Sequence, residues 1–231
     1  MDISGGFMSS RLRIGALGNS KILQRFIQTP EISEIGSIDI IATRSKESAL
    51  VAGASYPDKQ VLVGYEAVLE HKDLDAVYIC LPAGLHFEWA KKVLDAGKHV
   101  LIEKPAVLSA HEARTLDEIA VARKLVLMEA WWYRFHPLVQ SLRQLVDSNT
   151  LGAIRHISSS FSYVNSDPND SRWKVELGGG ALNDMFSYHI DFLNYVMGIQ
   201  NRDVDLIQAF SSSQHGVDAS IAAELITNKG V

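Results

Sequence analysis

The stretch HVLIEKP, residues 99–105, decides how the rest of the chain is interpreted. Residues 100–102 are consecutive and apolar, which is typical of a parallel strand covered on both faces. Glu103 and Lys104 follow at the carboxyl end of this strand, where ligands bind in open α/β sheets. A lysine that is partly desolvated at such a place can exchange protons. The alternative is a surface Glu-Lys pair at a turn, and these residues alone leave both open.

Composition narrows the class of protein. The chain has 231 residues, of which 47% are hydrophobic and 21% charged, as in ordinary globular proteins. A net charge of -5 without a Lys/Arg cluster argues against a nucleic-acid partner. A single cysteine, Cys80, excludes an internal disulfide framework and a cysteine-rich metal site, and we expect no metal. No apolar run reaches membrane-span length and residues 1–10 lack a signal-peptide core, so we expect a cytoplasmic protein with a disordered leader over 1–10.

The first segments after this leader have the order of a dinucleotide-binding unit. An apolar strand over 12–17 is followed by Gly18 and by a helix pattern that stops at Pro30. The helix N-terminus, at Lys21 and Ile22, would face a pyrophosphate. The G-x-G-x-x-G fingerprint is degraded, because the positions aligned on Gly18 hold glycine, serine and leucine (Gly18, Ser20 and Leu23).

The second strand, over 38–42, ends at Thr43-Arg44 without an acidic residue. A carboxylate at this strand end would bind the ribose 2′-hydroxyl of NAD, whereas an arginine accommodates a 2′-phosphate. Read alone, the segment is a solvated loop. Because the segment follows the glycine turn at Gly18, its arginine favours NADP(H) over NAD(H).

Strands and helices alternate up to about residue 130, which predicts a doubly wound parallel (Rossmann) sheet over 11–130. Ser109 and Glu112 form a capping box for one of these helices. Residues 131–231 predict an α+β domain with a mostly antiparallel open sheet. Its expected elements are a strand over 157–163, a helix over 181–197 and two strands over 203–212 and 219–227.

Two further groups of side chains carry polar chemistry. Residues 129–137 hold four aromatics and Arg134, which suits a small polar ligand with an apolar face or an aromatic joint between domains. On the helix over 181–197, Asp184 and Tyr188 lie four residues apart and share a face. Such a pair can hold a hydroxyl and orient a proton donor, although an aspartate near a helix start often only compensates the dipole.

Together these segments resemble the glucose-fructose oxidoreductase, inositol dehydrogenase and rhizopine-catabolism (Gfo/Idh/MocA) family, in its branch of dihydrodiol and sugar dehydrogenases. The resemblance runs from about Leu12 to the end of the chain. The segments that carry it are Tyr78–Pro82 with His86, Ala96–Pro105, Met128–Ala130 with Tyr133–Pro137, and Gly178–Leu182 with Asp184 and Tyr188.

The resemblance implies hydride transfer between NADP(H) and a CH-OH or C=O carbon of a sugar, cyclitol or cyclic diol. Lys104 would hold the substrate hydroxyl and help its proton leave, Tyr188 would take the acid/base position and Asp184 would orient the substrate. The residues expected to bind the cofactor are Gly18, Ser20, Lys21, Ile22, Thr43, Arg44, Leu81, Pro82, His86, Glu103 and Lys104. Those expected to bind the substrate are Trp131, Trp132, Arg134, Phe161, Asp184 and Tyr188.

Some positions depart from the family's pattern. Besides Ser20 and Leu23, Ala83 replaces a common asparagine and Phe186 replaces a glycine. These departures motivate the alternative of a catalytically silent, nucleotide-binding regulator on the same fold.

The chain is also shorter than the family's usual length. Residues 228–230 predict a hairpin turn, after which roughly a hundred residues complete the sheet in the family. We therefore expect an incomplete second domain over 131–231. Its open sheet would join a homodimer or a higher oligomer.

Overall fold

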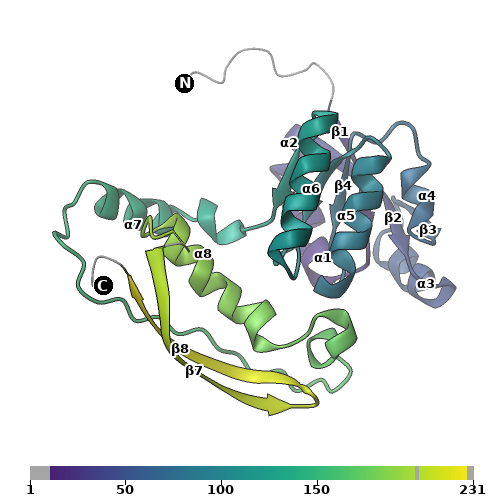
Figure 1. Ribbon diagram of the computed structural model, residues 1–231. Helices are drawn as coiled ribbons and strands as arrows, with labels where there is room; N and C mark the ends of the chain where they lie inside the picture. The colour runs from purple at the N-terminus through teal and green to yellow at the C-terminus, as the bar shows by residue number, and fades with distance from the viewer. Residues whose placement is uncertain (1–10, 201–202, 228–231) are drawn as a thin grey trace. The chain divides into compact units, whose positions relative to one another are not determined.

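The computed structural model describes residues 11–200 and 203–227 (Figure 1). The chain divides into two compact units. The first comprises the chain up to Leu81 together with Leu85–Glu129, and the second comprises Pro82–Gly84 together with the chain from Ala130 onward. The expected leader over 1–10 and the expected hairpin turn over 228–230 lie outside the described residues.

The first unit is a doubly wound parallel sheet, as predicted. Its six strands run in the order β3-β2-β1-β4-β5-β6, and every neighbouring pair is parallel. The strands are β1 Leu12–Leu17, β2 Gly36–Thr43, β3 Gln60–Val63, β4 Ala76–Ile79, β5 His99–Ile102 and β6 Leu127–Glu129. The helices are α1 Lys21–Gln28, α2 Ile32–Ile35, α3 Lys46–Ser55, α4 Glu66–Leu69, α5 His86–Asp95 and α6 Ala110–Arg123.

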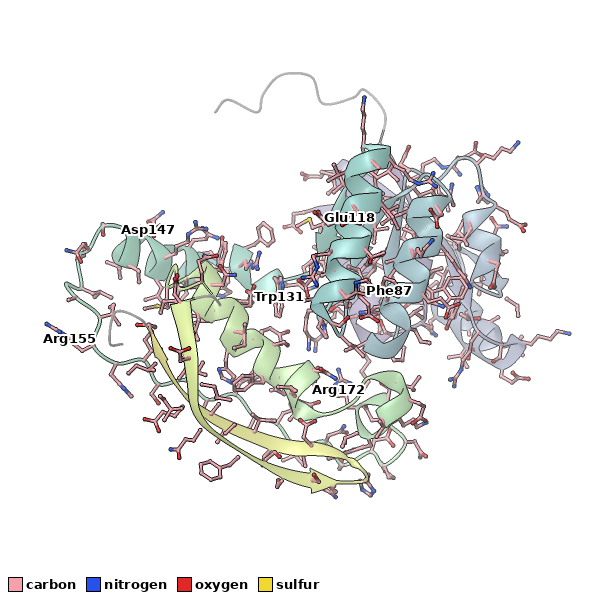
Figure 2. The ribbon with its side chains drawn as sticks, in the orientation of Figure 1. Phe87, Glu118, Trp131, Asp147, Arg155 and Arg172 are labelled. Atoms are coloured by element: carbon pink, nitrogen blue, oxygen red, sulfur yellow. The ribbon has the colours of Figure 1, made fainter. Side chains whose placement is uncertain are left out.

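Apolar side chains cover both faces of this sheet. On one face, strand residues such as Ile79 and Ile102 pack with residues of α5 and α6, including Leu94 and Leu116. Figure 1 shows these two helices side by side, and Figure 2 marks them by the side chains of Phe87 and Glu118. On the other face, Leu23 and Phe26 of α1 pack with Ala52 of α3 and with Tyr78. Coverage of the central strands from both faces explains the continuous apolar runs in the sequence.

The capping box of α6 forms with one difference from the usual pattern. Ser109 Oγ accepts a hydrogen bond from the Glu112 amide at 3.2 Å, as expected of an N-cap residue. The Glu112 carboxylate accepts in turn from the amide of Leu108 at 3.0 Å, one residue before the cap.

The direction of the sheet's strand order reverses between β1 and β4, and this switch point is where ligands bind in such sheets. Gly18 closes β1 there with a φ of +102°. A Cβ at this position would lie 3.0 Å from the Cys80 carbonyl oxygen. Only glycine combines this conformation with so close an approach of the two strand ends.

The second unit contains helices and one antiparallel hairpin. Its strands, β7 Val204–Gln214 and β8 Val217–Thr227, are joined through His215 and Gly216, whose positive φ values of 53° and 84° suit a two-residue hairpin turn. Its helices are α7 Pro137–Asp147 and α8 Ser187–Tyr195, with shorter turns at η2 Trp132–Phe135, η3 Ser171–Trp173 and η4 Val175–Leu177. None of the described helices of either unit is long and apolar enough to cross a membrane.

The helix predicted over 181–197 differs from the observed one. The observed segment begins with a π turn, η5 Leu182–Phe186, and continues as α8, which ends at Tyr195. A π turn bonds each residue to the fifth residue along, so spacing rules for an α-helix do not apply across it.

The strand predicted over 157–163 was wrong. Residues 154–167 have no regular secondary structure, and the side chain of Arg155 lies in solvent (Figure 2). A strand requires a ladder of backbone hydrogen bonds to a neighbour, and this segment pairs with no strand among the described residues.

Candidate active site

The turn after β1 is built around Ser20, the N-cap of α1. Its Oγ accepts from the Leu23 amide at 3.2 Å. The amides of Lys21 and Ile22 stand in the first turn of α1, where backbone N–H groups lack partners within the helix and can face an anion. Leu23, where the fingerprint has glycine, is fully buried against the sheet. The irregular fingerprint therefore still forms a strand, a tight turn and a helix N-terminus.

Thr43 is the last residue of β2 and Arg44 is the next residue, and the two have different surroundings. Thr43 is buried, and its hydroxyl lies 3.2 Å from the Ser45 carbonyl oxygen and 3.4 Å from that of Leu62. Arg44 is exposed. Its charge lies close enough to Tyr65 to oppose the rise that burial causes in the pKa of that phenol. The cation at this strand end is therefore accessible, while Thr43 holds the loop.

His86 connects the loops that follow β4 and β5. Its ring is buried, with Nδ1 2.7 Å from the Pro105 carbonyl oxygen and Nε2 2.8 Å from the Leu81 carbonyl oxygen. Burial lowers the pKa of His86, opposed by these two carbonyls. Leu81 itself is buried and Pro82 is half-buried. His86 thus fixes the two strand ends that flank the predicted cofactor face.

The Glu-Lys-Pro segment leaves β5 beside β4. The Glu103 amide donates to the Ile79 carbonyl at 2.9 Å, which continues the ladder by one residue. Glu103 Oε1 accepts from the hydroxyl of the buried Tyr78 at 2.6 Å. Burial and the neighbouring Glu103 carboxylate raise the pKa of Tyr78, so the phenol remains a donor. Lys104 is half-buried and joins Pro105 through a cis peptide bond.

In the second unit, Tyr188 lies among three aromatic rings. Its ring centroid is 5.1 Å from that of the buried Trp131, 5.8 Å from Tyr133 and 5.3 Å from Phe161. These distances are typical of edge-to-face and tilted aromatic contacts. Trp132 is exposed. The predicted substrate residues Trp131, Phe161 and Tyr188 are therefore in one cluster.

Arg134 forms an ion pair inside the second unit. Its guanidinium donates through two nitrogens to the buried carboxylate of Asp191, which also accepts from the Tyr133 hydroxyl. The guanidinium also lies over the Tyr195 ring, 4.7 Å from its centroid. The structure thus places Arg134 where it neutralises a buried carboxylate, and its predicted role in substrate binding stays a prediction.

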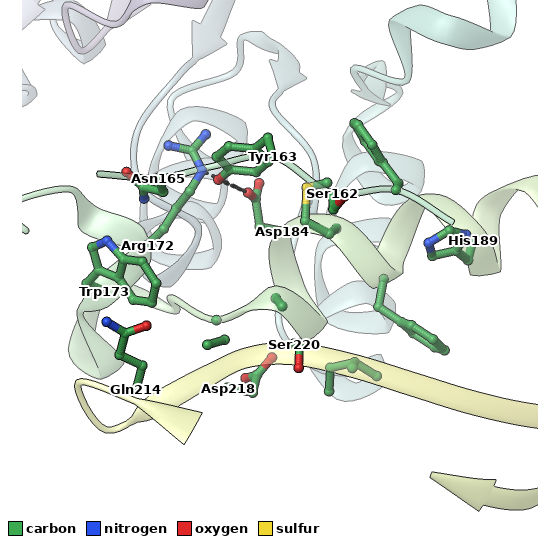
Figure 3. A pocket seen from close by; sticks show the side chains of 17 residues that line it. Ser162, Tyr163, Asn165, Arg172, Trp173, Asp184, His189, Gln214, Asp218 and Ser220 are labelled. Carbon is green, nitrogen blue, oxygen red and sulfur yellow. Dashed lines mark hydrogen bonds and ion pairs between the residues drawn. The ribbon is translucent and has the colours of Figure 1, made fainter. Parts of the chain in front are cut away.

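Asp184 lines a cavity of about 420 Å³ in the second unit (Figure 3). Its Oδ2 accepts from the Tyr163 hydroxyl and from Arg172 Nε, each at 2.8 Å. Phe161 and Phe186 are also among the lining residues, whereas Tyr188 is not. The π turn explains why Asp184 and Tyr188 do not line this cavity together, although they lie four residues apart.

Arg172 and the role of Tyr163 were not predicted from the sequence. Arg172 stands in a polar loop with no motif of its own. The only sequence signal was its place six residues before the Gly178–Gly180 segment, which the structure packs against it. Among the described residues, no cluster of His, Cys, Asp or Glu is arranged to hold a metal ion.

Comparison with known proteins defines the class. Residues 12–130 match the oxidoreductase family with a NAD-binding Rossmann fold, and residues 139–231 match the GFO/IDH/MocA C-terminal domain. The chain belongs to the Gfo/Idh/MocA oxidoreductase family, and its first unit is the NAD(P)-binding domain of that family.

Two of the relatives that it matches are named for reactions on sugars. The chain is 37% identical over 192 residues to a dTDP-3,4-didehydro-2,6-dideoxy-alpha-D-glucose 3-reductase of Streptomyces violaceoruber, which covers 83% of this chain and 56% of the relative. It is 37% identical over 163 residues to a D-xylose 1-dehydrogenase (NADP(+)) of Haloferax volcanii, covering 70% of this chain and 50% of that enzyme.

A solved structure is similar over almost the whole chain. KijD10, a 3-ketoreductase of Actinomadura kijaniata in complex with NADP and TDP-benzene, superposes with a TM-score of 0.86 at 31% identity. The superposition covers 96% of this chain and 68% of KijD10. The chain thus spans about half to two thirds of the length of the relatives it matches.

Proposed function

We propose that this chain belongs to an NADP(H)-dependent oxidoreductase that transfers hydride between the nicotinamide and a CH-OH or C=O carbon of a sugar, cyclitol or cyclic diol. The observation that carries the proposal is the edge of the first unit's sheet. There the Gly18 turn, the α1 N-terminus and the exposed Arg44 stand at neighbouring strand ends, beside the switch point.

The residues present fit a dinucleotide. The first-turn amides of α1, which follow the tight turn at Gly18, would supply donors to a pyrophosphate. Arg44, with no acid at the strand end, suits a 2′-phosphate. When bound, the nicotinamide would supply or accept the hydride. KijD10 and the Haloferax xylose dehydrogenase, both named with NADP, support the preference.

The remaining chemistry is proton handling by this chain's own side chains. Lys104 would hold the reacting hydroxyl and take or return its proton. Tyr188, whose ring is fixed by Trp131 and Phe161, would take the acid/base position. Asp184 would accept a hydrogen bond from a neighbouring substrate hydroxyl and so orient the ring.

A second candidate function is a catalytically silent, nucleotide-binding regulator. The observation that favours it is Phe186, whose ring lines the Asp184 cavity and occupies space that a glycine would leave open. Such a protein would bind NADPH and perform no hydride transfer.

Two measurements on the same preparation test these functions. Fluorescence titration with NADPH and NADH should give tighter binding of NADPH, and tighter binding of NADH would refute the cofactor preference. Turnover is then measured with a panel of sugars, cyclitols and trans-dihydrodiols. NADPH binding without oxidation or reduction of any of them would favour the regulator.

A further inference from the structure

Asp184 is held by two donors at one oxygen. Arg172 Nε and the Tyr163 hydroxyl each lie 2.8 Å from Oδ2 (Figure 3). The side chain of Asp184 is 16% exposed and that of Arg172 is 48% exposed, so the carboxylate is the more buried member of the pair. Two fixed donors on one oxygen restrict rotation of the carboxylate.

Arg172 is itself held by contacts other than the one to Asp184. Asp170 Oδ1 accepts from the Arg172 amide at 2.9 Å and from its Nη1 at 3.2 Å. The Arg172 carbonyl accepts from the Gly180 amide at 3.0 Å. A Cβ at Gly179 would collide with this carbonyl, so glycine permits the contact. The Gly178–Gly180 segment thus positions Arg172 through its backbone.

Charge reinforces the arrangement. Burial alone would lower the pKa of Arg172, but the Asp184 and Asp170 carboxylates raise it overall, so the guanidinium stays charged. Burial and the hydrogen bond to Asp184 raise the pKa of Tyr163, so the phenol keeps its proton and remains a donor. Both donors therefore persist across the neutral pH range.

The rest of the cavity suits an uncharged ring that carries hydroxyl groups. Trp173 and Phe161 supply apolar surface, while Asn165, Gln214 and Ser220 supply polar groups, as in sites for small polar ligands. Asp218 is used locally, since its Oδ2 accepts from the Leu182 amide at 2.5 Å. With Arg172 paired to carboxylates, the cavity offers no excess positive charge to a phosphate.

We infer that Arg172 is the positioning residue of Asp184, which it holds ready to accept a hydrogen bond from a hydroxyl of an uncharged carbohydrate or cyclitol. The inference rests on the proposed function only in taking Asp184 as a substrate-binding residue. Arg172 acts through Asp184 and not on the reacting carbon.

The test is equilibrium binding of D-xylose, D-glucose and myo-inositol, measured by ligand-observed NMR on the full chain saturated with NADPH. Arg172→Gln removes the charge, and Arg172→Lys keeps it without the Nε–H donor. The matched control is Arg123→Gln, because Arg123 forms a 2.9 Å ion pair with Asp95 and is 46% exposed, but lies in the first unit. NADPH binding is titrated for every variant.

The parent is expected to bind at least one probe. Arg172→Gln should weaken that binding at least tenfold, Arg172→Lys should restore part of it, and Arg123→Gln should stay within twofold. The Kd for NADPH should stay within threefold throughout, which separates positioning from general loss of structure. If Arg172→Gln does not fold, the test uses Arg172→Lys instead, which should bind the probe at least threefold more weakly than the parent.

Two results would overturn the inference. One is equal probe binding by the parent and the folded Arg172 variant. The other is a parent that binds none of the three probes. Turnover in the same samples is scored separately, because a parent that binds sugar without reacting refutes the proposed activity and leaves the role of Arg172 standing.

Discussion

The two units are stabilised in different ways. In the first, the strands are covered on both faces by apolar clusters, and residues such as Leu17 and Ile79 are fully buried. In the second, every residue of β7 from Asp205 to Gln214 is exposed, and the buried described residues are Ala130, Trp131, Gly180, Asp191, Val196 and Val217. Polar contacts such as Arg134 to Asp191 and Arg172 to Asp184 connect its segments.

This difference matters for function because each kind of stabilisation suits the role proposed for its unit, which is cofactor binding for the first and substrate recognition for the second. An apolar core holds strand ends rigidly, as a cofactor site built from backbone groups requires. Charged hydrogen bonds hold side chains in specific orientations, as recognition of hydroxyl groups requires. We therefore expect substitutions in the first unit to change stability and cofactor binding, and substitutions at the polar contacts of the second to change substrate binding.

Lys104→Ala should have the largest effect. It is also an exception to the expected difference between the units, because Lys104 lies in the first unit but would act on the substrate. Turnover should fall by roughly 10²–10⁴, the usual contribution of a positioned proton-transfer group. NADPH binding should stay within a few-fold. Lys104→Arg should rescue little, because a guanidinium cannot give up its proton near neutral pH.

The control for Lys104 is Lys91→Ala, which removes an exposed helical ion pair with Asp95. Its turnover should match the parent, as measured by steady-state kinetics. A kcat for Lys104→Ala within threefold of the parent would remove this lysine from the mechanism.

The contrast in packing predicts unequal costs for removing similar side chains. Ile79→Ala creates a cavity in a fully buried cluster and should lower the free energy of unfolding by about 2–5 kcal/mol. Leu206→Ala on β7, where the side chain is 61% exposed, should change it by about 0.5 kcal/mol or less. Urea denaturation followed by circular dichroism measures both, and equal costs would contradict the comparison.

Cys80 offers a chemical measure of the rigidity of the first unit. Burial raises the pKa of its thiol to about 12, above the ordinary value near 8.5. At pH 8 the thiolate fraction is therefore lower by roughly 10³, and labelling by a disulfide reagent should be slower by about that factor than in urea-unfolded chain. Fast labelling of the native protein would show that β4 opens readily.

Arg44→Ala addresses cofactor choice, and its expected effect is smaller than that of Lys104→Ala. Loss of a charged hydrogen bond to a 2′-phosphate should weaken NADPH binding by about 10–100-fold, from the roughly 1.5–3 kcal/mol of such bonds. NADH binding should be unchanged. Parallel fluorescence titrations measure the ratio, and equal weakening of both would show that Arg44 does not contact the 2′-phosphate.

Local signals predicted the first unit well. The apolar run at 100–102 became β5, and the Ser109 cap forms at the start of α6, because neighbouring residues alone determine these features. The strand predicted over 157–163 failed for a different reason, since alternation of side chains cannot supply a pairing partner.

The polar contacts could not be predicted in the same way. Tyr163 and Arg172 reach Asp184 across 21 and 12 residues of chain, and Tyr78 reaches Glu103 across 25. Their partners depend on how the elements pack, and nothing in the local pattern marks them. The side chains that hold Asp184 and Glu103 in place are thus the least visible in the sequence.

The π turn at Leu182–Phe186 has a consequence for how this site can change by mutation. Such a turn amounts to one residue inserted into an α-helix, and each residue of an α-helix rotates the chain by about 100°. Deleting the codon of Met185 or Phe186, which lie between Asp184 and Tyr188, would leave a regular helix and keep Tyr188 in its aromatic cluster. It would also swing Asp184 away from Tyr163 and Arg172, so a single in-frame deletion could erase hydroxyl recognition while the helix that carries it survives.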